Sequence, residues 1–238
     1  MTEPGRIEGV ALVTGGTGAL GRAVVAELLD GGAEVCCCWI AEREREAIEA
    51  ELGAREGLHM VEADLLADGG PGRAAAAAGE LGPLRSLVNL VGGFAAGGRL
   101  HEAPAEELQR MLALNLTTAV NTSRAALPAM IEAGAGAIVC VGARTGLRPF
   151  SGGAAYAISK AAVLALVRSL DVEYRDDGVR ANAILPSVID TPANRAAEPD
   201  ADHSKWVSPA EIARVVRFLC SQDSAPISGA DIPVYGRA

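Results

Sequence analysis

Residues 10–21 read Val-Ala-Leu-Val-Thr-Gly-Gly-Thr-Gly-Ala-Leu-Gly, a short apolar run followed at once by a glycine-rich turn. The run Val10–Val13 predicts a buried strand, and the spacing of apolar residues over Ala19–Leu29 predicts a helix directly after the turn. Glycines let a backbone approach a pyrophosphate closely, and a helix N-terminus adds N–H groups and a positive dipole. The stretch therefore predicts a strand–turn–helix unit that binds dinucleotide phosphates, with an ordinary glycine-rich turn as the alternative.

The alternation of apolar runs and helical patterns continues along the chain. Further strands are predicted at Glu34–Ile40, Leu58–Glu62, Ser86–Val91, Ala137–Val141, Arg180–Leu185 and Asp231–Val234. Helices are predicted at Glu42–Leu52, Arg73–Leu81, Pro104–Ala133, Gly153–Arg175 and Pro209–Cys220. Strands that are apolar throughout and separated by helices indicate a parallel sheet covered on both faces. We therefore expect an α/β fold, a doubly wound parallel sheet (Rossmann fold), in a single domain over residues 1–238, with a loop-rich insert at 186–207.

A tyrosine and a lysine one helical turn apart, Tyr156 and Lys160, are the main candidates for chemistry. Residues four apart lie on the same face of a helix, so the lysine charge can stand close to the phenol. A nearby cation favours the phenolate and lowers the tyrosine pKa from ~10 toward a working pH, as general acid–base catalysis requires. The alternative is a surface tyrosine beside a surface lysine.

Composition and charge exclude several classes of partner. The chain has a net charge of -9, which disfavours nucleic acid and anionic membrane surfaces. We find neither an apolar run of signal-peptide length at the start nor a run of the ~20 apolar residues that a membrane span needs. An odd count of five cysteines indicates a reduced, cytoplasmic protein. Cys36, Cys37 and Cys38 are expected to alternate faces of a strand as small hydrophobes; without metal-ligand spacing, they predict no metal site.

The glycine turn matches the TGxxx(A/G)xG pattern of the short-chain dehydrogenase/reductase family, which the whole chain resembles. The matching residues, expected to bind the cofactor, are Thr14, Gly15, Thr17, Ala19, Leu20 and Gly21. Tyr156 and Lys160 match the family's YxxxK motif, and Asn115 matches its helix asparagine. The resemblance implies an NAD(P)H-dependent oxidoreductase acting on a small molecule. Lys160 would also bind the nicotinamide ribose, and Asn115 would anchor a water in the proton relay.

Other stretches extend the resemblance and the expected cofactor site. Asp64 falls where the family has an acid near the adenine, and Asn89 and Gly92 are the first and last residues of its NNAG motif. Residues 186–191 resemble the PGxxxT stretch that holds the nicotinamide amide, through Pro186, Ile189 and Thr191, with a serine replacing the glycine. The family commonly assembles through its two long helices, here 104–133 and 153–175. The resemblance thus implies a homodimer or homotetramer.

The family's catalytic serine lies thirteen residues before its tyrosine, and here that position holds Ala143. A methyl group cannot donate to a substrate oxygen, and the loss of one such donor typically costs ~10²–10³ in kcat. Two alternatives stay open. Either Thr145 or Ser151 takes the serine's place, or the substrate does not need the donor.

One branch of the family, dihydropteridine reductase, fits the second alternative, in which the substrate does not need the serine donor. It has an alanine at the serine position, and the chain is similar to it at residues 91–95 and through the loop 185–209. This resemblance implies a quinonoid dihydropterin or a related conjugated imine or quinone-like ring as substrate. Ala143, Thr145, Phe94 and Trp206 are the expected pocket residues. The rivals are a carbonyl reductase or alcohol dehydrogenase that uses Thr145 or Ser151, and a dinucleotide-binding protein with little catalysis.

The sequence leaves NAD versus NADP open. An acid at the end of the second strand would bond the ribose 2′-OH, and an arginine would accept a 2′-phosphate. Trp39 and Ile40 occupy those positions and do neither, while Glu42 or Arg43 can substitute with opposite consequences. The glycine turn has no basic residue before Arg22, which slightly favours NADH.

Overall fold

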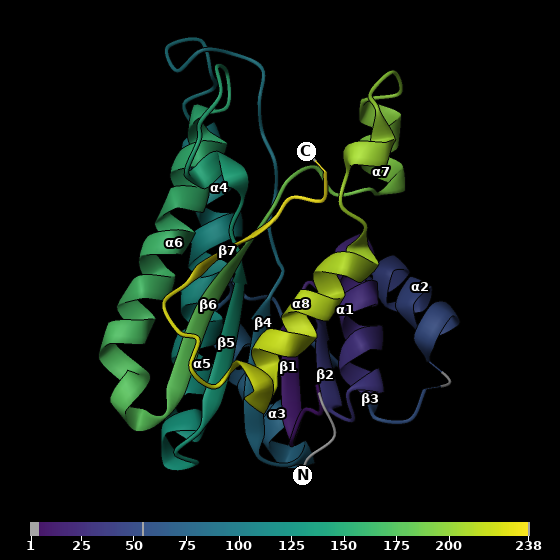
Figure 1. The fold of residues 1–238 in the computed structure, drawn as a ribbon, viewed down its shortest axis with the longest axis vertical. Coiled ribbons are helices and arrows are strands. Elements are labelled where there is room, and N and C mark those ends of the chain that lie inside the picture. Colours follow the sequence, from purple (N-terminus) through teal and green to yellow (C-terminus); the bar gives the residue numbers. More distant parts are fainter. Residues whose placement is uncertain (1–4, 54, 238) are drawn as a thin grey trace.

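The computed structural model describes residues 5–53 and 55–237. Seven parallel strands form one sheet in the order β3-β2-β1-β4-β5-β6-β7 (Figure 1). The strands are β1 (Val10–Thr14), β2 (Glu34–Trp39), β3 (Leu58–Glu62), β4 (Leu84–Asn89), β5 (Gly136–Val141), β6 (Val179–Pro186) and β7 (Asp231–Val234). The predicted doubly wound α/β fold is confirmed.

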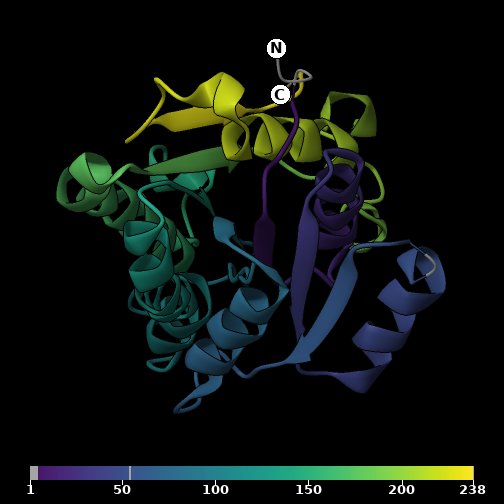
Figure 2. The same cartoon turned by 90° about the horizontal axis from the view of Figure 1, so that it is seen from below.

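Helices cover both faces of this sheet. They are α1 (Ala19–Asp30), α2 (Glu42–Leu52), α3 (Gly70–Leu81), α4 (Glu107–Leu112), α5 (Thr118–Glu132), α6 (Ala154–Tyr174), α7 (Pro192–Ala197) and α8 (Pro209–Cys220). Helices α1, α2 and α8 lie on one face, and α3, α5 and α6 lie on the other (Figure 2). Their buried residues form one core on each face. Among the described residues, no helix is long and apolar enough to cross a membrane.

The three consecutive cysteines of β2 show how one strand serves both layers. Cys36 and Cys38 pack in the core beside α3 and α5, whereas Cys37 packs in the core beside α1 and α8. All three are free and buried, and burial raises the pKa of Cys36 to about 11. The predicted alternation of faces is confirmed.

Several predicted bounds are off by one to three residues: the strand predicted at Ser86–Val91 is β4, Leu84–Asn89, and the helix predicted at Arg73–Leu81 begins at Gly70. Two predicted segments differ more substantially from the structure. The expected helix 104–133 begins only at Glu107 and consists of α4, a π-helical turn over Ala113–Thr117, and α5. The loop-rich insert 186–207 contains α7, which starts at a proline and is capped by the Thr191 hydroxyl, 3.2 Å from the Asn194 N–H. A threonine cap followed by proline is a standard helix start. Helix α7 is missing from the sequence-based prediction because the helix is short and lies in a segment rich in prolines.

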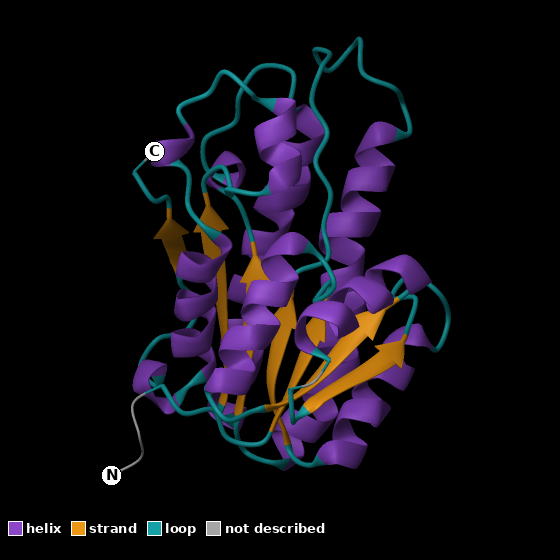
Figure 3. Cartoon of the chain, turned by 90° about the vertical axis from the view of Figure 1, so that its right-hand side faces the viewer, coloured by secondary structure: helices purple, strands orange, loops and turns teal. Residues whose placement is uncertain are grey.

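The strand order reverses direction between β1 and β4, which pair side by side. Their carboxyl ends therefore bring the glycine turn and the segment after β4 together at the edge where the strand arrowheads and the long loops gather (Figure 3). Leu90 N–H donates to the Thr14 carbonyl at 3.1 Å. Gly15 has φ +66°, and a Cβ there would lie 2.8 Å from the Val91 nitrogen. Ligands bind at such reversal points in open α/β sheets.

We expect opposite results from alanine at two helical glycines. A Cβ on Gly21 would lie 2.6 Å from the Gly16 Cα and closer still to the Gly15 carbonyl, so Gly21→Ala should lower the free energy of unfolding by ~1–3 kcal/mol. Gly79 on α3 is exposed with open space around it, so Gly79→Ala should raise it by ~0.5–1 kcal/mol. Urea denaturation of both variants checks this; equal shifts would contradict the close packing of the turn.

Candidate active site

The glycine turn is a cradle that side chains would fill. A Cβ on Gly16 would collide with the Cys37 sulfur, and one on Gly21 would collide with the turn itself. The first N–H groups of α1 have no partner within the helix, and the first turn of α1 carries no acidic residue. This bare, positively polarised helix start fits the diphosphate of a dinucleotide.

Thr14 and Asn89 hold the two strand ends rather than facing outward. The Thr14 hydroxyl accepts from the Leu90 N–H at 3.3 Å, and Asn89 Oδ1 accepts from the Thr122 hydroxyl at 2.6 Å. Both side chains are buried. They therefore position the turn and the segment after β4.

Asn115 lies in the π-helical turn and clamps the segment after β4. Its Oδ1 accepts from the Gly93 N–H at 2.9 Å, and its Nδ2 donates to the Gly93 carbonyl at 3.1 Å. A Cβ on Gly92 would lie 2.6 Å from Asn115 Oδ1 and 3.4 Å from Lys160 Nζ. The segment after β4, the π-helical turn and α6 therefore meet here only because residue 92 is glycine.

Ser159 is a site residue that sequence reasoning missed. It is fully buried, accepts from Asn115 Nδ2 at 3.0 Å and donates to the Tyr156 carbonyl at 2.8 Å. The Asn115 amide thus uses both donors inside the protein and is tied to α6. A serine beside a lysine has no distinctive pattern, so only the spacing Tyr156–Ser159–Lys160 on one helix could have hinted at it.

Tyr156 and Lys160 come together as predicted, with Nζ 5.9 Å from the centre of the phenol ring. Lys160 is buried and donates to the Val141 carbonyl at 2.8 Å. Burial lowers the pKa of Lys160 to about 8, partly opposed by Cys140. The expected lowering of the tyrosine pKa is wrong for this structure, because burial raises the pKa of Tyr156 to about 12.

Ala143 follows β5 and is buried at 6% exposure. It precedes a short 3-10 turn, Arg144–Gly146, that packs on α6: a Cβ on Gly146 would lie 3.0 Å from the Lys160 carbonyl carbon. Thr145 is half-buried in this turn, whereas Ser151 is exposed on the next loop.

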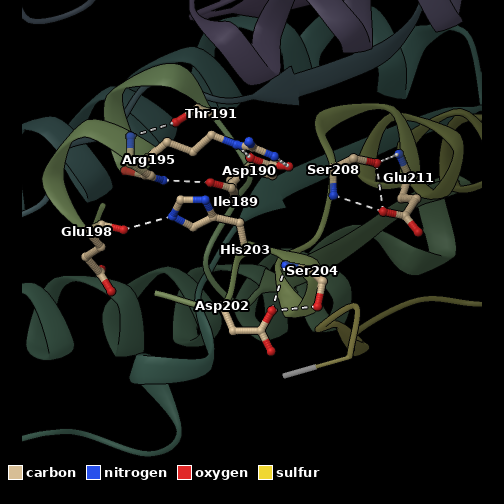
Figure 4. A network of polar contacts seen from close by, with 11 residues as sticks. Ile189, Asp190, Thr191, Arg195, Glu198, Asp202, His203, Ser204, Ser208 and Glu211 are labelled. Atoms are coloured by element: carbon tan, nitrogen blue, oxygen red, sulfur yellow. Dashed lines mark hydrogen bonds and ion pairs between the residues drawn. The ribbon is translucent and has the colours of Figure 1, made fainter. Parts of the chain in front are cut away.

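The segment between β6 and α8 forms a closed loop over residues 190–206. Its neck is joined by Asp190 N–H donating to the Val207 carbonyl at 2.8 Å, and Ile189 pairs with Val207. Within the loop, Arg195 Nη2 pairs with Asp190 at 2.8 Å (Figure 4). The Thr191 hydroxyl is engaged as the cap of α7, and Pro186 ends β6.

The two aromatic pocket candidates lie in different surroundings. Phe94 packs edge-on against Tyr156, with ring centres 5.0 Å apart. Trp206 is half-buried in the closed loop, and its ring packs against His203 at 4.3 Å. The structure therefore brings Phe94 to the tyrosine and gives Trp206 a partner within the loop.

The remaining predicted residues surround the end of β2 and β3. Thr17 of the glycine turn donates its hydroxyl to Glu44 of α2 at 3.0 Å. Trp39 lies under the Arg45 guanidinium, 5.4 Å from the ring centre. Asp64 is exposed after β3 and accepts from the Leu66 N–H at 2.9 Å. Glu44 was not among the residues expected to matter here.

A glycine cradle at the strand-order reversal, with a tyrosine and a lysine beside it, defines the class of nicotinamide-dependent α/β oxidoreductases. Residues 9–202 match the family described as short chain dehydrogenase, and the chain belongs to this family. It is an oxidoreductase that uses a nicotinamide dinucleotide.

Known proteins similar to this chain cover nearly its whole length. A 2,5-dichloro-2,5-cyclohexadiene-1,4-diol dehydrogenase of Sphingobium indicum is 32% identical, covering 95% of this chain and 94% of its own. A 2-(R)-hydroxypropyl-CoM dehydrogenase of Xanthobacter autotrophicus is 32% identical, with coverages of 95% and 97%. The crystal structure of levodione reductase has a TM-score of 0.88 at 26% identity, with coverages of 98% and 97%.

Proposed function

We propose that the protein is an NAD(P)H-dependent reductase in which Tyr156 gives the proton that accompanies hydride transfer. The observation that carries the proposal is the meeting of Tyr156, Lys160 and Asn115 beside Gly92, at the sheet edge that carries the glycine turn. A protein that only binds a dinucleotide has no need for a buried lysine beside a half-buried phenol.

The chain's own residues would hold the dinucleotide from three directions. The diphosphate would lie on the glycine turn and the N-terminus of α1, and Lys160 and Thr191 would hold the nicotinamide half. Bound in this way, the nicotinamide supplies a hydride, which carries two electrons. Lys160 Nζ lies 3.4 Å from the Cβ position of Gly92, so its cation faces the space beside that glycine.

Tyr156 completes the chemistry by moving one proton. Its pKa of about 12 keeps the phenol protonated at neutral pH, as a proton donor must be. When hydride adds to the substrate carbon, the double bond to oxygen or nitrogen opens and that atom takes the phenol proton. Solvent then restores the proton to the phenolate, which the Lys160 cation stabilises. Asn115 and Ser159 act as positioning residues for α6.

The proposed substrate is a quinonoid dihydropterin or a related conjugated imine or quinone-like ring. Ala143 supports this choice, because a conjugated ring already delocalises the charge that a serine donor would otherwise stabilise. The ring in the name of the Sphingobium relative agrees with a cyclic substrate.

An alcohol or carbonyl substrate is the second candidate. Two relatives are named for a diol and a hydroxypropyl compound, and Thr145 is half-buried two residues after Ala143. In this alternative the Thr145 hydroxyl donates to the substrate oxygen in place of the serine.

NADH is the proposed cofactor, on the basis of Glu44. Its carboxylate reaches the glycine turn at Thr17, where it can accept from a ribose hydroxyl and would repel a 2′-phosphate. Arg45, which lies over the Trp39 ring, is engaged by Glu42 and Glu49.

We also infer a homodimer or homotetramer in the cytoplasm. Ile158 and Val172 of α6 are 45% and 81% exposed, which supports packing of α6 against a second copy. The five cysteines lie among the described residues, where each is free and buried, which supports a reducing compartment.

Tyr156→Phe tests the mechanism. The variant should lose at least ~10²-fold in kcat for any reduced substrate, because the proton donor is gone, while its Kd for the dinucleotide stays close to wild type. Stopped-flow turnover and cofactor fluorescence titration measure the two quantities. An unchanged kcat would remove the mechanism.

Thr145→Val separates the two substrate candidates. If the substrate is a conjugated ring that needs no donor, kcat with quinonoid dihydropterin should change by less than about 3-fold, as for a nearby substitution that touches no reacting atom. If Thr145 replaces the serine, kcat with ketones should fall by ~10²–10³. Steady-state assays with a pterin and a ketone panel decide between them, and Ser151→Ala on the same panel tests the other hydroxyl that can take the serine's place.

Glu44→Gln tests the cofactor preference by binding alone. Wild type should bind NADH about 10-fold more tightly than NADPH. The variant should bind the two with about equal Kd, because a charge close to the 2′-phosphate is removed. Glu46→Gln, an exposed position on the same helix, should keep the wild-type ratio. Tighter NADPH binding by wild type would overturn the assignment.

A further inference from the structure

Two of the chain's three phenylalanines are exposed near Tyr156, one against its ring and the other against the first phenylalanine. Phe94 is 64% exposed and Phe150 is 45% exposed. Their rings are nearly parallel, at 22°, with centres 6.5 Å apart, and Phe94 also contacts the Tyr156 ring at 5.0 Å. Aromatic surface left in water next to a reacting group is available to a ligand.

We propose that Phe94 and Phe150 form an aromatic wall that selects substrates with a flat conjugated ring. The inference rests on the reductase function proposed above and names the substrate class that its site takes. A flat ring that lies against both phenylalanines is held beside the Tyr156 hydroxyl, whereas an open-chain substrate of equal reactivity contacts little of this surface.

The wall is built by two loops that the fold holds together. Phe94 follows β4, and Phe150 precedes α6. The Gly97 N–H donates to the Gly152 carbonyl at 3.0 Å, which joins the two loops directly. Ala95, next to Phe94, is buried against Met111 and Ala155. Phe94 therefore projects from an anchored backbone.

The ring of Phe150 is held in place by its contact with a glycine. Its ring lies over the backbone of Gly153, where a Cβ would stand 2.5 Å from the ring's Cζ. Gly153 also precedes the first residue of α6, three positions before Tyr156. The position of the Phe150 ring is thus set by the same helix start that sets the phenol.

The wall adds apolar surface next to Tyr156. Phe94 packs edge-on against the phenol ring, and burial of the tyrosine raises its pKa to about 12. A flat substrate that replaces water over this surface keeps the phenol shielded and protonated until hydride transfer.

Binding of a flat ring that cannot be reduced tests the wall without any turnover. The probe is naphthol, titrated by its fluorescence against the full chain saturated with oxidised dinucleotide. Phe94→Ala and Phe150→Ala should each weaken the naphthol Kd about 10-fold, and Phe94→Leu and Phe150→Leu should fall between, because they keep apolar volume but lose the ring. Phe218→Ala is the matched control, since Phe218 is 40% exposed on α8, away from Tyr156.

A second readout uses two α-diketones, phenanthrenequinone, which is flat and cyclic, and diacetyl, which is open-chain. The ratio of their kcat/KM values should fall about 10-fold in each alanine variant and stay at the wild-type value in Phe218→Ala. Failure of wild type to bind naphthol, or equal effects of all three alanine variants, would overturn the wall.

The two proposals fail in different ways. If naphthol binds through Phe94 and Phe150 while Tyr156→Phe leaves turnover unchanged, the wall stands and the reductase mechanism falls. If Tyr156→Phe abolishes turnover while the ratio for the two diketones is unaffected by Phe94→Ala and Phe150→Ala, the mechanism stands and the wall falls.

Discussion

The pairing of β1 with β4 is the constraint on which the rest of the site depends. Parallel strands end at the same edge, so this one pairing places the glycine turn against the segment after β4, as the short distance between Gly15 and Val91 shows. Any side chain at Gly15 would push the glycine turn and the segment after β4 apart. The dinucleotide site is therefore a consequence of strand order first and of residue chemistry second.

The Asn115 amide connects the segment after β4 to α6 by hydrogen bonds. It bonds Gly93 on one side and Ser159 on the other, and Ser159 bonds the Tyr156 backbone. The side chains of Asn115 and Ser159 are buried, where unpaired polar atoms are costly. The π-helical turn that contains Asn115 is a less stable form of helix, and such turns persist mostly where a site needs them.

The sequence predicts the fold well because its signals are local. The glycine turn, the apolar strands and the Tyr156–Lys160 spacing each lie within a few residues, and the structure has all of them. Ser159, Glu44 and Phe150 escaped prediction because their roles come from contacts across the fold. The tyrosine pKa was misjudged for the same reason: spacing gives the distance to a charge, whereas burial depends on everything packed around the phenol.

Ala143 and the aromatic wall both bear on how the site orients a substrate and stabilises its charge without the serine donor. A site that lacks one preorganised donor must recover orientation and charge stabilisation from elsewhere. A flat conjugated ring supplies charge delocalisation from its own bonds, and Phe94 with Phe150 offers a surface that orients such a ring beside the phenol. An open-chain ketone supplies neither, and for it the missing serine is a real loss. The alanine and the two exposed phenylalanines thus favour the same substrates independently.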